Sequence, residues 1–461
     1  MVDIKEQKSF DLLQEEKDIV IANNPNHELS QELNKLLEGV FDSVTEPFTT
    51  IYTLGKIKAK RVHVVNYAKL MCNCKKDKIY NNIAALKEDV VVLVDTFETD
   101  KYLQIMQDMS ERILTKNYVF NTYKSKKEEK SKDFFYYGET KIYDAVKKGY
   151  VYGESINKAK ELVDTPYNYL NAEQLADFSK KLEELDNVTV TILDKKAIEA
   201  MNMGAFLGVN KGSLDEPKLI YIKYQGLEKW ENPTALVGKG VMYDTGGYSL
   251  KGPAHMPGMK VDMAGSAAVI CSMNAIAKLK AKANVIAIVA ATDNRIGDKA
   301  IVPDDILTAA SGKTIEVIST DAEGRLTLAD AVWFAQKEGS KKVIDVATLT
   351  GAMVAALGKE YTGAFTNDSE FLKEFKVATE KTKEPIWEMP INKGYHKELE
   401  SKVADIKNKG SRYAGASQAA AFIEEFIEEG TAWIHLDIAG TASNKQGGTG
   451  VMVKAFTELF L

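Results

Sequence analysis

A chain of 461 residues is longer than one hydrophobic core usually organises, so we expect two domains. Hydrophobic residues make up 45% of the chain and charged residues 27%, which excludes a chain that is disordered throughout. The net charge of −6 argues against a protein that is attracted to nucleic acid or to an anionic membrane by its overall charge. Residues 1–10 are polar and no run of about eighteen apolar residues occurs, so we expect a cytoplasmic protein without a membrane span.

The first 140 residues predict a small α/β domain. Apolar runs typical of strands occur at 18–22, 49–54, 61–65 and 89–94, and a helical pattern lies among them at 80–86. A segment rich in lysine and glutamate follows at 124–132. Because its charges have both signs, we interpret it as a solvated surface loop rather than a nucleic-acid patch.

A connecting helix is predicted at 141–165. Apolar residues recur there at helical spacing, and the pattern stops ahead of Pro166, since the residue before a proline disfavours helical backbone. Gly149 and Gly153 fall inside this run. Each costs a helix interior about 1 kcal/mol relative to alanine, so the sequence allows a break or kink there.

Residues 166–461 predict a larger α/β domain with a mostly parallel central sheet. Strand patterns alternate with amphipathic or small-residue helices, which is typical of parallel sheets covered on both faces. These strand patterns lie at 188–193, 219–224, 235–237, 285–290, 315–318, 343–346 and 433–436. In such sheets the reactive groups collect just beyond the carboxyl ends of the strands.

Two charged motifs follow predicted strands or open predicted helices. The motif VGKGVMYDTGGYSLK begins where the run 235–237 ends, and it places Lys239, Asp244 and Lys251 in a predicted glycine-rich loop. Such a loop approaches a ligand closely and could bind an anion or a metal cluster. In the motif MKVDMAGSAAV, Asp262 opens a predicted helix, where a helix N-cap is the simpler interpretation of one aspartate.

A third motif, STDAEGRLTLADA, follows the predicted strand at 315–318 and carries Asp321, Glu323 and Arg325. In an extended chain residues two apart share a face, so both carboxylates could reach one site. Taken singly, Arg325 could form a surface ion pair and the lysines could be solvated. The occurrence of seven such charged residues within 239–325 favours one common site instead.

Four carboxylates in one pocket would repel one another strongly unless cations neutralise them. Two divalent metals supply four positive charges, so charge balance favours two metals over one. The five histidines lack the H-x-x-x-H spacing of zinc proteases, which excludes that class of site.

These motifs, with DVATLTGA and WIHLDIAG, resemble the leucyl aminopeptidase family of metallopeptidases from about Ala159 to the C-terminus. The resemblance implies a catalytic domain that hydrolyses the N-terminal peptide bond of peptides through a metal-bridging hydroxide, with a preference for leucine-like or other apolar first residues. It also implies two divalent ions per subunit, manganese or zinc in the first place and cobalt or magnesium as alternatives. Bicarbonate as the general base and a homohexamer, with the N-terminal domain in assembly or regulation, are implied as well.

The resemblance also assigns the metal ligands. Asp244 and Glu323 would bridge the two metals, and Asp262 with Lys239, as a neutral amine, would complete the tighter site. Asp321 would complete the more exchangeable site.

Further roles follow from the same resemblance. Lys251 would stabilise the negative charge that develops on the substrate's carbonyl oxygen, and Arg325 would hold the bicarbonate with backbone groups of Gly324 and Leu349. The pocket for the first side chain would be lined by Met259, Thr348, Gly351, Ala439 and Ala442.

The chain departs from the family at positions next to these residues. The family usually has Asn, Ser and Gly where Ser319, Thr245 and Ala264 stand, and none of the three is an expected ligand. Three other functions stay open: a catalytically silent scaffold, a DNA-binding accessory protein with secondary peptidase activity, and a dipeptidase for cysteinyl-glycine. The complete ligand set argues against the first and the acidic charge balance against the second.

Overall fold

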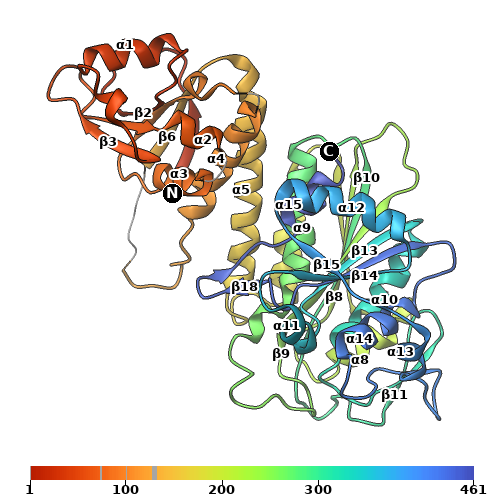
Figure 1. Ribbon diagram of the computed structural model, residues 1–461. Coiled ribbons are helices and arrows are strands. Elements are labelled where there is room, and N and C mark those ends of the chain that lie inside the picture. Colours follow the sequence, from red (N-terminus) through yellow and green to blue (C-terminus); the bar gives the residue numbers. More distant parts are fainter. Residues whose placement is uncertain (1, 73–74, 100, 127–131) are drawn as a thin grey trace. The chain divides into compact units, whose positions relative to one another are not determined.

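The computed structural model describes residues 2–72, 75–99, 101–126 and 132–461 (Figure 1). The chain divides into two compact units, Met1–Asn157 and Lys158–Leu461. Both units are mixed α/β structures, which confirms the predicted fold class. Residues 127–131 of the segment that we interpret as a surface loop lie outside the described residues.

The first unit is built on a six-stranded sheet in the order β1-β6-β5-β2-β4-β3. All neighbouring strands are parallel except β3 and β4, which are antiparallel. Strand β2 is buried throughout, with Val20 and Ala22 in one hydrophobic cluster and Ile19 and Ile21 in another. The strands are β1 (Val2–Glu6), β2 (Asp18–Ala22), β3 (Phe48–Tyr52), β4 (Arg61–Val65), β5 (Val90–Leu93) and β6 (Lys132–Tyr137).

Helices pack on both clusters of the first unit. Helix α1 (Glu28–Leu36) contributes Leu33 to the cluster around Ile19, whereas α3 (Lys76–Ala84) and α4 (Tyr102–Lys116) belong to the cluster around Val20. The short helix α2 (Tyr67–Met71) precedes α3. Because both faces of β2 are buried, its residues are apolar on both sides and form a continuous apolar run in the sequence.

Helix α5 (Tyr143–Asp164) is continuous through both glycines, so the break or kink that the sequence allows does not occur. A Cβ atom at Gly149 would lie 2.1 Å from the backbone oxygen of Gln107, and one at Gly153 would lie 2.8 Å from Cβ of Leu114. Both contacts are with α4. The glycines therefore allow the two helices to pack closely, which offsets their poor helix propensity.

The second unit is built on an eight-stranded sheet in the order β15-β14-β17-β13-β9-β10-β8-β7. Its centre is parallel, and antiparallel pairs lie toward the edges, where β14 pairs with β17 and β8 pairs with β10 and β7. The strands are β7 (Val188–Leu193), β8 (Lys218–Gln225), β9 (Thr234–Asp244), β10 (Asn284–Asn294), β13 (Lys342–Ala347), β14 (Thr362–Thr366), β15 (Ile386–Glu388) and β17 (Ala432–Asp437).

Two predicted strands differ from those observed. Strand β9 continues to Asp244, so Lys239 belongs to the strand and not to a glycine-rich loop. A Cβ atom at Gly238 would lie 2.7 Å from backbone of the neighbouring helix, which explains a glycine in a central strand. The pattern at 315–318 is the short strand β12 (Thr314–Glu316), which pairs with β11 (Ile306–Thr308) and β16 (Ile406–Lys407) in a separate sheet. Ile315 and Val317 are buried in the core without joining the large sheet, whereas Ile318 is exposed.

Helices cover both faces of the large sheet (Figure 1). One face packs against α8 (Gly204–Asn210), α10 (Gly324–Lys337) and α14 (Gly415–Glu424), and the other against α9 (Ala264–Lys278). A Cβ atom at Gly265 would lie 2.1 Å from the backbone oxygen of Val346, so the small first turn of α9 lies directly on the sheet. Within the described ranges, no helix has both the length and the apolar character that a membrane crossing needs.

Asp330 on α10 joins three elements of the second unit. Its Oδ2 accepts a hydrogen bond of 2.9 Å from Phe206 N in α8, and its Oδ1 accepts one of 2.7 Å from Ala310 N after β11.

An asparagine at position 330 would offer one acceptor and leave a buried N–H facing its amino group. We expect Asp330→Asn to lower the free energy of unfolding of this unit by about 1–3 kcal/mol. All four tryptophans lie in this unit, so urea unfolding followed by tryptophan fluorescence measures the change. The exposed Asp298→Asn is the control, and equal unfolding midpoints for both variants would contradict the prediction.

Candidate functional site

The carboxyl ends of the central strands bring the charged motifs together. Asp244 ends β9, and Thr348 follows β13. Asp262 lies in a 3-10 turn, Met259–Met263, directly before α9, and Glu323 directly precedes α10. These residues line one cavity of about 740 Å3, together with Lys239, Lys251, Asp321 and Arg325.

Lys239 holds two of the carboxylates. Its Nζ lies 2.7 Å from Asp262 Oδ2 and 2.9 Å from Glu323 Oε1, and it donates a hydrogen bond of 3.0 Å to the backbone oxygen of Thr348. A Cβ atom at Gly324 would lie 2.7 Å from this Nζ, so the glycine makes room for the lysine. Burial opposes the charged lysine, but Asp262 and Glu323 more than offset it and raise the pKa of Lys239, which is therefore an ammonium here.

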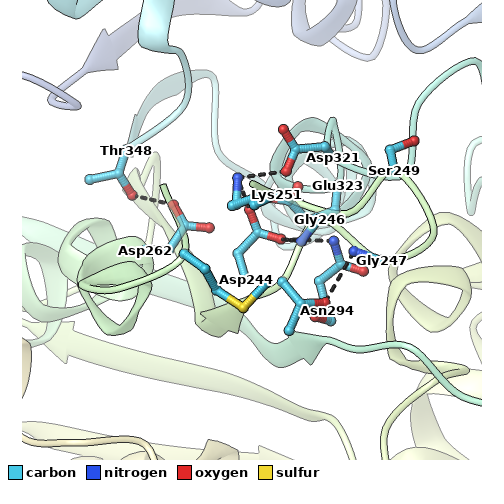
Figure 2. A network of polar contacts seen from close by, with 12 residues as sticks. Asp244, Gly246, Gly247, Ser249, Lys251, Asp262, Asn294, Asp321, Glu323 and Thr348 are labelled. Carbon is cyan, nitrogen blue, oxygen red and sulfur yellow. Dashed lines mark hydrogen bonds and ion pairs between the residues drawn. The ribbon is translucent and has the colours of Figure 1, made fainter. Parts of the chain in front are cut away.

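Lys251 holds the other two carboxylates (Figure 2). Its Nζ lies 2.7 Å from Asp244 Oδ2 and 2.5 Å from Asp321 Oδ1. Asp244 Oδ1 accepts hydrogen bonds of 2.8 Å from Asn294 Nδ2 and from the backbone N–H of Gly246. Gly246 has φ of 84°, a backbone conformation that favours glycine. The carboxylate of Asp244 is thus fixed on both oxygens.

Burial and mutual repulsion act on these carboxylates. Burial, with the neighbouring Glu323, raises the pKa of Asp244 to about 6, and burial also raises the pKa of Asp262. For Glu323, burial is outweighed by Lys239 and Lys251, which lower its pKa. The two lysines therefore favour the ionised form of Glu323.

The carboxylate oxygens that bind the two lysines are also arranged in a way that suits a metal ion. One oxygen from each of Asp244, Asp262 and Glu323 can be chosen so that all lie within 4.8 Å of one another. Among the described residues, the buried Glu323 Oε2 has no hydrogen-bond donor. A buried acceptor without a donor costs about 1–3 kcal/mol. Carboxylate oxygens with one amine suit several divalent metals.

Asp321 differs from the other carboxylates. Its side chain is 38% exposed, against 3% for that of Glu323. The segment around it turns, and Glu323 has the helical angles φ −77° and ψ −35°, so the expectation that both residues share the face of an extended chain is wrong. They reach the site separately, each through its own lysine.

The simpler interpretation of Asp262 as a helix cap is also wrong. The N-cap of α9 is Met263, and Asp262 Oδ1 accepts a hydrogen bond of 2.8 Å from Lys239 Nζ. It accepts a second one of 2.8 Å from the hydroxyl of Thr348 (Figure 2). The residue is 5% exposed. Its side chain therefore points into the cluster of charges.

Arg325 is buried rather than part of a surface ion pair. Its Nη1 donates a hydrogen bond of 2.8 Å to the backbone oxygen of Asn408, and its Nε finds no acceptor among the described residues. Burial lowers the pKa of Arg325 to about 10, which leaves it charged at neutral pH. Leu349 lines the cavity, and its N–H donates a hydrogen bond of 3.2 Å to Asp437 Oδ1. Gly324, the first residue of α10, does not line the cavity.

The cavity also has an apolar part. Met259, Thr348, Gly351 and Ala439 line it, whereas Ala442 is buried at 2% exposure and does not. The sequence did not indicate the apolar lining residues Leu250, Val261, Ala322, Ala352 and Val354.

Comparison with known proteins identifies the family of this chain. The cytosol aminopeptidase family, catalytic domain, matches residues 157–457. The chain belongs to the cytosol aminopeptidase family. A solved structure of a tomato leucine aminopeptidase variant is similar over 100% of this chain and 96% of its own, with 28% sequence identity and a TM-score of 0.83. The chain is therefore an aminopeptidase, a hydrolase of a family that depends on two metal ions.

The structure explains one departure from the family. The hydroxyl of Thr245 donates a hydrogen bond of 2.8 Å to the backbone oxygen of Asn294 and accepts one of 3.2 Å from Gly247 N. A serine hydroxyl would make the same bonds, so the extra methyl group leaves this part of the site intact. Ser319 is held through its backbone by Asn408, and Ala264 is the buried first residue of α9.

Asn294 is a site residue that sequence reasoning missed. It lies 50 positions from the aspartate that it orients. The signal that could have found it is its place at the end of β10, a central strand beside β9. Polar residues at that edge of a parallel sheet are candidates for a site.

Proposed function

We propose that this aminopeptidase removes leucine-like and other apolar residues from the N-terminus of peptides with the help of two divalent metal ions. The observation that carries the proposal is the buried group of Asp244, Asp262 and Glu323, in which Glu323 Oε2 accepts no hydrogen bond from the described residues. The same cavity has an apolar part suited to the first side chain.

The ligands that we propose are those implied by the family resemblance. Asp244 and Glu323 would bridge the metals, Lys239 and Asp262 would complete the tighter site, and the more exposed Asp321 would complete the exchangeable one. Lys239 would lose its proton on binding. When bound, two divalent cations would polarise the scissile carbonyl and lower the pKa of an attacking water. Manganese or zinc is our first assignment, with cobalt and magnesium as alternatives.

The chain's own residues would orient the substrate and stabilise charge. The carboxylates would attract the free amino group, while Met259, Thr348, Gly351 and Ala439 would form the pocket for the first side chain. Lys251 would stabilise the negative charge that develops on the carbonyl oxygen. Arg325 would hold bicarbonate as the general base, with Gly324 and with Leu349, whose N–H would then be shared with Asp437.

Assembly and location are proposed on the family resemblance. We propose a cytoplasmic homohexamer in which an N-terminal domain, residues 1–140, serves assembly or regulation. Residues 141–165 connect it to a catalytic domain at 166–461. Sedimentation of the full chain tests this, since a mass near the monomer value of 51.0 kDa would contradict it.

The experiment that tests the function is hydrolysis of aminoacyl p-nitroanilides by metal-stripped protein with manganese or zinc restored. We expect no activity before restoration, and afterwards about tenfold or higher kcat/KM for leucine than for aspartate as the first residue. Cysteinyl-glycine is included to test the dipeptidase alternative. A folded protein that is inactive on every substrate with every metal would overturn the proposal.

A further inference from the structure

The cavity carries two cations that the proposed mechanism does not use. Lys409 and Arg412 line it together with the acidic residues, and both are exposed. Lys239 and Lys251 are paired with the carboxylates of the site. In the described part of the chain, neither Lys409 nor Arg412 has an ion-pair partner; Arg412 lies 5.4 Å from the ring centre of its neighbour Tyr413.

The loop that carries these cations is anchored at its start. Asn408 is fully buried; its Oδ1 accepts a hydrogen bond of 2.8 Å from Ile318 N, and its Nδ2 donates one of 2.7 Å to the backbone oxygen of Ser319. Its own backbone oxygen accepts the hydrogen bond from Arg325. That oxygen belongs to the peptide bond that joins Asn408 to Lys409. The backbone of Lys409 therefore begins one peptide unit from a residue of the site.

The rest of the loop is held by Gln418 on α14. This side chain is buried, and its Nε2 donates hydrogen bonds of 2.7 Å to the backbone oxygen of Tyr413 and 3.2 Å to Ser411 Oγ. A Cβ atom at Gly410 would lie 2.6 Å from Gln418 Oε1, so the loop packs directly on the glutamine. Lys409 and Arg412 therefore extend from a fixed backbone, which lowers the entropic cost of binding an anion.

The distribution of charge indicates what these cations bind. An unblocked peptide carries a positive amino group at one end and a negative carboxylate at the other. The acidic residues suit the amino group, the apolar lining suits the first side chain, and cations would repel the amino group. Only the part of the peptide beyond the scissile bond remains for them.

We infer that Lys409 and Arg412 bind a carboxylate on the departing part of the substrate. This carboxylate is either the C-terminus of a short peptide or an acidic side chain at its second residue. The inference rests on the proposed function and names its substrate class: short peptides with a free carboxylate near the scissile bond.

The test compares three substrates of the metal-restored full-length enzyme: leucyl-glycine, leucyl-glycinamide and the α-amide of leucyl-aspartate. We expect kcat/KM for leucyl-glycine to exceed that for leucyl-glycinamide about fivefold, mainly through KM, and the ratio to fall as salt rises. In the double variant K409Q/R412Q the ratio should fall to about one. The control is K402Q, an exposed lysine nearby that does not line the cavity.

The aspartate amide distinguishes the two sources of the carboxylate. Faster hydrolysis of the aspartate amide than of leucyl-glycinamide supports a side-chain carboxylate, and equal hydrolysis of these two amides supports the C-terminus. Equal, salt-independent kcat/KM for all three substrates in the wild type would overturn the inference and leave the proposed function standing. A preference that survives in the double variant would also overturn it. Failure to hydrolyse any of the three would overturn the proposed function itself.

Discussion

Replacing Glu323 with glutamine is expected to lower kcat/KM about a thousandfold, which corresponds to about 4 kcal/mol of lost stabilisation. The change preserves the size of the side chain but removes its charge from the centre of the cluster. It deletes the ion pair of 2.9 Å with Lys239 and turns one oxygen into an amino group, which cannot bind a cation. Bound metal per chain after dialysis should fall together with activity on leucine p-nitroanilide.

The matched control for Glu323→Gln is Glu429→Gln, which makes the same chemical change at an exposed position. Circular dichroism would establish that both variants are folded. Retention of full metal content by Glu323→Gln, with unchanged kcat/KM, would show that this carboxylate is no ligand. Loss of activity with full metal content would place its role in the chemical step instead.

Lys251→Ala is expected to reduce kcat by about a hundredfold to a thousandfold with a smaller effect on KM. Lys251 Nζ lies between Asp244 and Asp321 (Figure 2), and in our proposal it stabilises the negative charge that develops on the carbonyl oxygen. A group that acts mainly in the transition state affects kcat more than binding. Steady-state kinetics on leucine p-nitroanilide separates the two constants.

Metal content distinguishes this role from a structural one. Lys251→Ala should still bind metal, because Lys251 is not among the proposed ligands. The exposed Lys299→Ala serves as the control for the loss of one positive charge. A kcat close to that of the wild type, with metal bound, would refute the assignment of Lys251 as the residue that stabilises the oxyanion.

The sheets could be predicted because their central strands are apolar over several consecutive residues. Strands β2 and β4 have the bounds that this pattern predicts, and so does the edge strand β7, in which apolar residues and threonines alternate. The end of β9 could not be predicted, since Gly238, Lys239 and Gly240 resemble a loop in sequence. Their presence in a buried strand depends on the close approach of the α9 backbone, which is a tertiary contact.

The candidate site was predicted through its charged motifs, and what the sequence could not show was the set of groups that orient them. Asn294 and Asn408 lie far along the chain from the residues that they hold. Asn294 donates a hydrogen bond to the carboxylate of Asp244, and Asn408 accepts one from the backbone N–H of Ile318. Lys409 and Arg412 have the pattern of ordinary surface charge. Their place at the cavity depends on tertiary contacts of their loop with Asn408 and Gln418.

The ammonium groups of Lys239 and Lys251 give the site its own counter-ions. They offset two of the four negative charges that meet there, and each bridges carboxylates from two different segments of the chain. Each lysine therefore weakens the repulsion between two segments that must meet when the second unit folds.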